Sequence, residues 1–106
     1  INLNLELSQS LLELSTQERV LKLPQILQNI VERTHQNIIL LDNTEILFSI
    51  ALQHDPLRLL QKISRNKSII ATWNGLVQND YLTYAIPSHC EYRKYQIKDF
   101  IVVGLI

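Results

Sequence analysis

Four apolar residues in succession, at residues 38–41 (Ile-Ile-Leu-Leu), form the most distinctive pattern of the chain. An apolar run without polar alternation is typical of a strand buried on both faces, as at the centre of a parallel sheet covered by helices. Two further predicted strands, Ser68–Trp73 and Phe100–Leu105, also contain consecutive apolar residues. These runs predict the interior strands of a sheet.

Helical spacing dominates the segments between these strands. Ser15 and Glu18 have the spacing of a capping box, and apolar residues then recur every three or four positions, which predicts a helix over Thr16–Arg33. Pro24 interrupts this segment, so we expect a kink or two shorter helices. Asp55 followed by Pro56 is a helix-start signal. The other segments predicted to be helical are Ser8–Leu14, Glu45–Gln53 (a turn or two) and Pro56–Arg65.

Alternation of apolar and polar residues appears in two places. Ile1–Leu7 alternates apolar and polar residues, which predicts an edge strand. Tyr81–Ile86 and Glu91–Ile97 alternate roughly around Pro87 and predict a hairpin, preceded by a loop over Gly75–Asp80. Strands separated by helices predict an α/β fold with a mainly parallel sheet flanked by helices. The chain has 106 residues and is 46% hydrophobic, which is enough for one modest core, so we expect one domain over residues 1–106.

The charge balance and the cysteine content narrow the class of protein. Ten basic and ten acidic residues leave no formal net charge, so nothing global directs the chain to nucleic acid or to a membrane. Cys90 is the single cysteine and cannot form an internal disulfide. No apolar segment approaches the length of a membrane-spanning helix and no leader is evident, which predicts a cytoplasmic protein without membrane contact.

Candidate chemistry begins where the first apolar run ends. Asp42 follows the run directly and Glu45 lies close behind. In open α/β sheets, ligands bind at the carboxyl ends of the strands. This pattern resembles the Walker B motif of P-loop nucleoside triphosphatases, which implies that Asp42 holds the Mg²⁺ of a bound nucleotide and that Glu45 polarises the attacking water. The alternative is a buried strand followed by an ordinary turn.

Polar residues also follow the next predicted strand. Thr72 and Asn74 come at its end, and in a parallel sheet they would converge with Asp42 and Glu45. The same resemblance implies that Asn74 or Thr72 senses the terminal phosphate and that Arg65 contacts phosphate. Asn74-Gly75 is also a common turn dipeptide, and an arginine like Arg65 often only solvates a helix end.

The phosphate-cradling loop of such enzymes is missing from these residues. It requires a Gly-x-x-x-x-Gly-Lys-Ser/Thr run, whereas the chain has only Gly75 and Gly104. Hydrolytic members usually place a glutamate directly after the aspartate, where this chain has Asn43, so we expect weak hydrolysis unless Glu45 takes over. We therefore expect ATP and Mg²⁺ as cofactors of a complete protein, and no nucleotide bound to residues 1–106 alone.

A group of segments resembles one family in particular. They are Leu40–Phe48, Asp55–Leu60, Ser64–Asn66, Ala71–Gly75, Leu82–Ala85 and Glu91-Tyr92. They look like the P-loop-containing BrxF proteins of BREX phage-defence systems, and the resemblance covers nearly the whole chain. It implies an ATPase-like component that works with other proteins of a defence complex. Because the chain lacks methionine and opens on Ile1 within an alternating pattern, we expect that the first strand and the phosphate loop lie upstream of this sequence.

Rival interpretations remain open beside this one. One alternative is a non-catalytic interaction module. Another is contact with DNA through four basic residues: Arg58, Lys62, Arg65 and Lys67. An exposed sheet edge would favour self-association. A metal site would draw on His89, Cys90 and Glu91 with His54, although adjacent residues of an extended chain point to opposite sides. A catalytic triad built on Ser88 and His89 has no supporting motif.

Overall fold

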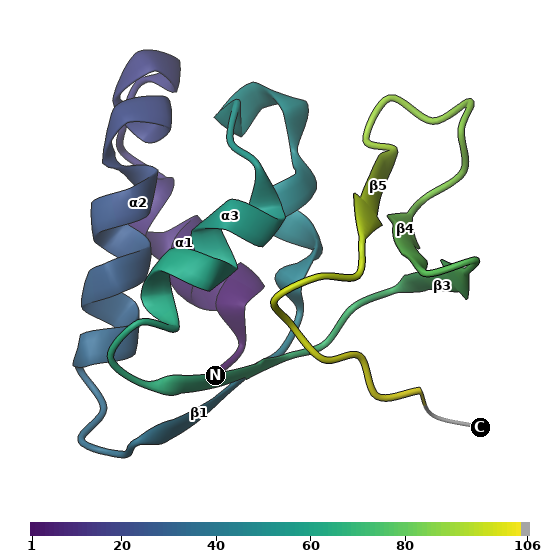
Figure 1. The fold of residues 1–106 in the computed structure, drawn as a ribbon. Coiled ribbons are helices and arrows are strands. Elements are labelled where there is room, and N and C mark those ends of the chain that lie inside the picture. The colour runs from purple at the N-terminus through teal and green to yellow at the C-terminus, as the bar shows by residue number, and fades with distance from the viewer. Residues whose placement is uncertain (105–106) are drawn as a thin grey trace. The chain divides into compact units, whose positions relative to one another are not determined.

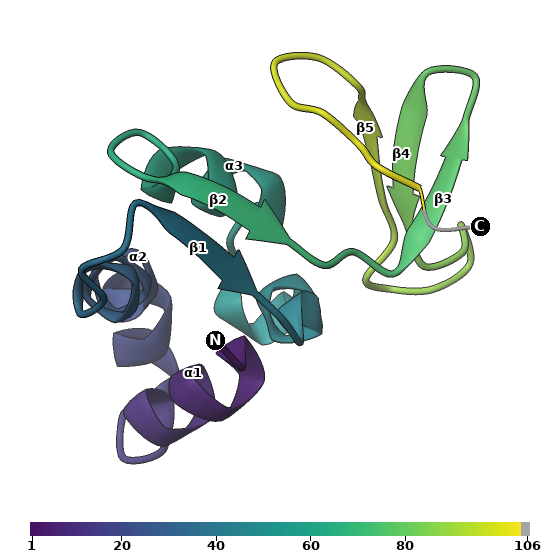
Figure 2. The same cartoon turned by 90° about the horizontal axis from the view of Figure 1, so that it is seen from below.

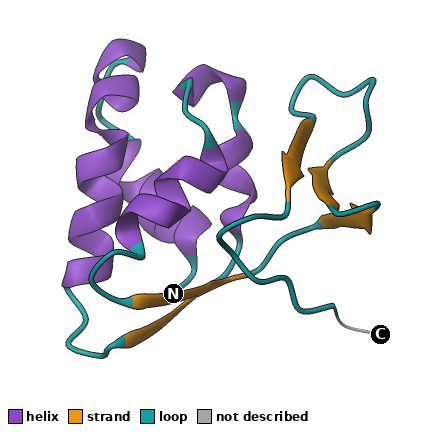
Figure 3. Ribbon diagram, in the orientation of Figure 1, coloured by secondary structure: helices purple, strands orange, loops and turns teal. Residues whose placement is uncertain are grey.

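The computed structural model describes residues 1–104. The chain divides into two compact units, residues 1–72 and the part that begins at Trp73. The described helices belong to the first unit, whereas the second is built of strands and loops (Figure 3). The fold is therefore mixed α/β, and the two units are described separately.

The first unit places helices against a small parallel sheet. Its elements are α1 (Leu3–Leu11), α2 (Thr16–Glu32), β1 (Ile38–Leu41), the 3₁₀ turns η1 (Thr44–Phe48) and η2 (Ile50–Leu52), α3 (Pro56–Ile63) and β2 (Ser68–Ala71) (Figure 1). Strand β1 pairs in parallel with β2, so that Ile38 lies opposite Ser68 and Leu41 opposite Ala71. The helices lie on one side of this sheet (Figure 2).

Burial along β1 alternates. Ile39 and Leu41 are 3% and 0% exposed and pack toward the helices, whereas Ile38 and Leu40 are 62% and 58% exposed. The prediction that this strand is buried on both faces is therefore wrong, because helices cover only one face. The fully buried leucines of the core are Leu3, Leu7, Leu23, Leu27, Leu41 and Leu47.

The start of the chain differs from its predicted edge strand. Residues 3–11 form α1, because Leu3, Leu7 and Leu11 recur every four residues and share one buried face. The side chain of Asn2 caps this helix by accepting a hydrogen bond from the Leu5 amide at 3.1 Å. Only Asn2 retains strand character, as an isolated parallel bridge to Asp42. The predicted helix over Ser8–Leu14 is the second half of α1 together with the turn that follows it.

Helix α2 confirms the predicted helix and continues through Pro24. Proline has no amide hydrogen, so the carbonyl four residues earlier, that of Val20, loses its intrahelical partner. The His54 ring supplies a replacement, since its Nε2 lies 2.6 Å from the Val20 oxygen. A carbonyl oxygen can only accept, so His54 donates from Nε2 in this structure.

The capping box of α2 makes a pH-dependent contribution to stability. The backbone amide of Ser15 donates to the Glu18 carboxylate, and this bond lowers the pKa of Glu18 below its usual 4.5, with smaller contributions from the Ser15 hydroxyl and Lys22. Because the pKa is lower in the folded state, the stabilisation is complete above the unfolded value. This stabilisation is lost as the pH falls through the pKa that Glu18 has in the folded state.

We therefore expect Glu18→Gln to lower the free energy of unfolding at neutral pH and to converge with the wild type as the pH falls below 4.5. Urea unfolding at a series of pH values measures the difference. Glu13→Gln is the matched control, because Glu13 is exposed and its side chain has no hydrogen bond or ion pair with residues 1–104. A constant difference between wild type and Glu18→Gln at every pH would contradict the expectation.

The second unit is a small antiparallel sheet. Its strands are β3 (Gly75–Gln78), β4 (Tyr81–Tyr84) and β5 (Arg93–Gln96), in the order β3-β4-β5. The predicted hairpin around Pro87 is confirmed as the pair β4–β5. The predicted loop over Gly75–Asp80 is wrong, because its first four residues form β3. Asn79 and Asp80, at φ 50° and 65°, provide the left-handed turn between β3 and β4.

Two further predictions about the sheet require correction. Apart from the isolated Asn2–Asp42 bridge, parallel pairing is confined to β1 and β2, and β3, β4 and β5 are antiparallel, so the prediction of a mainly parallel sheet is wrong. No strand forms over residues 100–104, and Leu105, the end of the predicted last strand, lies outside the described residues. Apolar residues alone do not make a strand without a neighbouring strand to pair with.

Candidate functional site

Asp42 and Thr72 meet at the carboxyl ends of the two parallel strands. Asp42 follows β1 and Thr72 follows β2, so the parallel pairing brings them to the same edge. The Thr72 hydroxyl donates to Asp42 Oδ1 at 3.2 Å, and the Asn43 amide donates to the same oxygen at 2.8 Å. Asp42 is exposed, and no hydrogen bond from residues 1–104 reaches its Oδ2. One carboxylate oxygen is thus held in place while the other remains available.

Backbone hydrogen bonds fix the position of this pair. The Asp42 amide donates to the Ile1 carbonyl at 2.8 Å, and the Asp42 carbonyl accepts from the Leu3 amide at 2.9 Å. On the β2 side, Thr44 is 2% exposed and its hydroxyl donates to the Thr72 carbonyl at 2.6 Å. The side chains of Asp42 and Thr72 therefore project from well-anchored backbone.

The other predicted site residues lie elsewhere. Glu45 is in η1, three positions after Asp42, and is partly exposed. Arg65 is exposed and precedes β2, whereas Thr72 follows it. A strand of this length spans about 13 Å, so Arg65 belongs to the opposite end of β2. Asn74 belongs to the second unit, directly before β3. Of the predicted residues, the structure brings together Asp42 and Thr72.

This arrangement suits a metal ion that takes few protein ligands. Mg²⁺ is commonly bound by one or two carboxylates together with waters and substrate phosphates, rather than by a complete protein cage. Within residues 1–104, no three histidine, cysteine, aspartate or glutamate side chains group together to hold a metal ion. The edge thus offers one carboxylate, Asp42, and one neighbouring hydroxyl.

The residues of the rival metal interpretation make other contacts. His89 Nδ1 accepts a hydrogen bond from the Glu91 amide at 3.0 Å, which stabilises the turn before β5. Cys90 is an exposed free thiol. His54, in the first unit, hydrogen-bonds to the Val20 carbonyl of α2.

The four predicted DNA-contacting residues divide into two groups. Arg58, Lys62 and Arg65 are exposed. Lys67 is partly buried and donates to the carbonyls of Val31, at 3.4 Å, and Thr34, at the carboxyl end of α2. A cation at this end of a helix is favoured by the helix dipole, so Lys67 stabilises the fold. DNA contact through the other three stays a prediction.

Sequence reasoning missed the residues that support the site. Ile1, Leu3 and Thr44 anchor the edge, yet their partners, Asp42 and Thr72, lie far away in the sequence. No local signal identifies Thr44, because Asn43 turns the chain at φ 54° and Thr44 begins η1, so its contact with Thr72 follows from tertiary packing.

Comparison of the chain with models of known protein families, with curated proteins and with solved structures found no match. Among the described residues, no helix combines the length and the apolar character that crossing a membrane requires.

Proposed function

We propose that this chain is part of an ATPase-like, P-loop-type component of a bacterial anti-phage defence system, in which Asp42 contacts the Mg²⁺ of a bound nucleotide. The observation that carries the proposal is the hydrogen bond of 3.2 Å between Thr72 Oγ1 and Asp42 Oδ1 at the carboxyl ends of adjacent parallel strands. The resemblance of the surrounding segments to BrxF proteins adds the defence context and implies other proteins of the complex as partners.

In this proposal Thr72 orients the carboxylate and Asp42 Oδ2 faces the ion. The negative Asp42 carboxylate attracts the positive Mg²⁺, either directly or through one bound water. Glu45 takes the role of polarising the attacking water, since Asn43 cannot accept a proton. Arg65 lies at the opposite end of β2 from Thr72, so the proposal gives it no part in binding the ion or the phosphates.

The nucleotide phosphates need a cradle that residues 1–106 do not contain. The proposal therefore places the glycine-lysine loop outside this sequence, in the complete protein. Such a loop would provide most of the affinity for ATP through its backbone amides, and Asp42 would add the dependence on Mg²⁺.

The test is calorimetric titration of the full-length gene product with ATP, in the presence and absence of Mg²⁺. We expect Asp42→Asn to weaken MgATP binding by about tenfold or more, with a much smaller effect on ATP without metal. Asp80→Asn is the matched control, because Asp80 is an exposed aspartate in the β3–β4 turn and its φ of 65° suits asparagine. Equal MgATP affinity for Asp42→Asn and wild type would refute the role of Asp42.

The alternative is a non-catalytic interaction module. It is favoured by the outer face of the β1–β2 sheet, where Ile38, Leu40 and Ile70 are each more than half exposed. Parallel sheets are normally covered on both faces, so an apolar face of this kind is a candidate protein-binding surface. Failure of the full-length protein to bind MgATP at all would favour this function over the first.

A further inference from the structure

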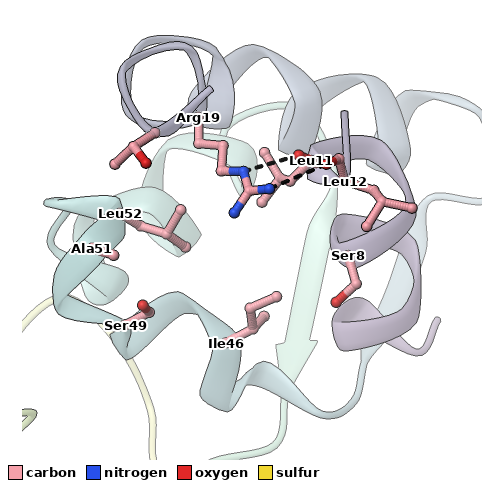
Figure 4. Close-up of a pocket in the computed structure, with 9 residues that line it drawn as sticks. Ser8, Leu11, Leu12, Arg19, Ile46, Ser49, Ala51 and Leu52 are labelled. Carbon is pink, nitrogen blue, oxygen red and sulfur yellow. Dashed lines mark hydrogen bonds between the residues drawn. The ribbon is translucent and has the colours of Figure 1, made fainter. Parts of the chain in front are cut away.

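A cavity of about 300 Å³ lies in the first unit, away from Asp42 (Figure 4). It is a pocket that is partly open to solvent, lined by α1, the start of α2 and the turns η1 and η2. Leu11 and Leu52, each 5% exposed, form part of its apolar lining together with Ile46. The hydroxyl-bearing residues Ser8 and Ser49 lie on opposite sides of it. The volume is at the lower end of the range for small-molecule sites.

Arg19 is the one charged residue among those that line this cavity. Its Nε donates to the carbonyls of Leu11 and Leu14 at 2.9 and 3.1 Å, and its Nη2 donates to the Leu12 carbonyl at 3.2 Å. These bonds cap the carboxyl end of α1. Nη1 makes no hydrogen bond to residues 1–104, and Figure 4 shows the guanidinium directed from α2 into the cavity.

The charge of Arg19 also has no counter-ion in the described part of the chain. The ion pairs there join Lys22 to Glu18 and Arg33 to Glu6, and none of these residues lines the cavity. A partly buried cation is usually balanced by an anion, because carbonyl dipoles compensate only part of its lost hydration. The cavity therefore combines an apolar lining with one unbalanced positive group that still has three N–H donors, two of them on Nη1.

We propose that this cavity binds a small carboxylate with a short aliphatic chain. The carboxylate accepts hydrogen bonds from Arg19 Nη1, and the chain packs against Leu11, Ile46 and Leu52. A monoanion matches the single guanidinium, whereas a doubly charged phosphate would leave net negative charge against apolar walls. At ~30 Å³ per water-sized group, the volume accommodates about ten non-hydrogen atoms, enough for a carboxylate with a chain of about six carbons.

Arg19 also caps α1, and this role alone would require no ligand. The test must therefore separate an effect of Arg19 on ligand binding from an effect on folding. The probe is sodium hexanoate, titrated into the ¹⁵N-labelled chain and followed by amide chemical shifts, with 1-hexanol as the uncharged comparison. We expect saturable shifts at cavity residues with a dissociation constant on the order of 1 mM, and binding of hexanol about tenfold weaker or more.

Two variants complete the experiment. Arg19→Gln is expected to weaken hexanoate binding about tenfold and leave hexanol binding unchanged, which a purely structural role would not produce. Ala51→Trp places a large side chain at an exposed position of the cavity wall and keeps Arg19, so it should block both ligands. This variant still tests the proposal if Arg19→Gln does not fold. Absence of saturable shifts in the wild type, shifts outside the cavity, or full hexanoate binding by Ala51→Trp would overturn the proposal.

Discussion

Leu41→Ala is expected to lower the free energy of unfolding of the first unit by about 2–5 kcal/mol. Leu41 is 0% exposed and lies in β1 on the face that the helices cover. Truncation to alanine removes buried methyl groups and leaves a cavity that the surrounding leucines fill only in part. The loss also loosens the strand that ends in Asp42. Urea denaturation followed by far-ultraviolet circular dichroism measures the change, since this unit contains the described helices.

Leu40→Ala is the matched control for this prediction. It makes the same chemical change one position earlier in β1, but Leu40 is 58% exposed and points away from the helices. We expect its effect to stay within about 0.5 kcal/mol. Equal losses for the two variants would mean that the outer face of the sheet is covered in solution, contrary to the exposure described above.

Local signals were sufficient to predict several elements correctly. The Ser15–Glu18 capping box identifies the start of α2, and Asp55 caps α3 by accepting from the Leu57 amide at 3.1 Å. Each of these signals is complete within a few residues of sequence. The hairpin around Pro87 likewise depends on neighbouring segments. Such elements are therefore accessible to reasoning from sequence alone.

Elements whose form depends on distant partners were predicted less well. Leu3 and Leu7 fit both a two-residue and a four-residue period, and only the cap by Asn2 and the burial of Leu11 favour the helix. Strand β3 runs directly into the turn at Asn79 and Asp80, whose residue types favour a loop over the whole of Gly75–Asp80. The apolar residues 100–104 have strand composition but no paired strand in the described structure.

The candidate site shows the same division. The meeting of Asp42 and Thr72 follows from two apolar runs and the geometry of parallel strands, so it was predictable. Arg19, His54 and Lys67 donate to backbone carbonyls at the end of α1 and in α2, where a helix end or a proline interrupts the regular helical hydrogen bonds. The sequence indicates where a helix end or a proline interrupts the helical hydrogen bonds. Tertiary packing decides which side chain reaches each of these carbonyls.

Gly75→Ala is expected to destabilise the second unit by about 1–3 kcal/mol, because β3 and β4 approach closely at this position. A Cβ atom at Gly75 would lie 1.7 Å from the Thr83 carbonyl oxygen and 2.8 Å from Trp73 Nε1. The same carbonyl accepts the hydrogen bond of the Trp73 indole at 3.0 Å. The added methyl group must therefore displace backbone of β4, which a rotamer change cannot avoid.

Fluorescence of Trp73 can report this displacement, because Trp73 is the single tryptophan of the chain. Its ring packs edge-on against Tyr84 and Tyr95, at centroid distances of 6.3 and 5.8 Å. We expect Gly75→Ala to red-shift its fluorescence and to lower the urea midpoint of that signal, because water gains access to the indole as β3 and β4 separate. Gly104→Ala is the matched control, since a Cβ there meets nothing within 4 Å. An unchanged emission spectrum and midpoint for Gly75→Ala would show that β3 does not pair with β4 at this end.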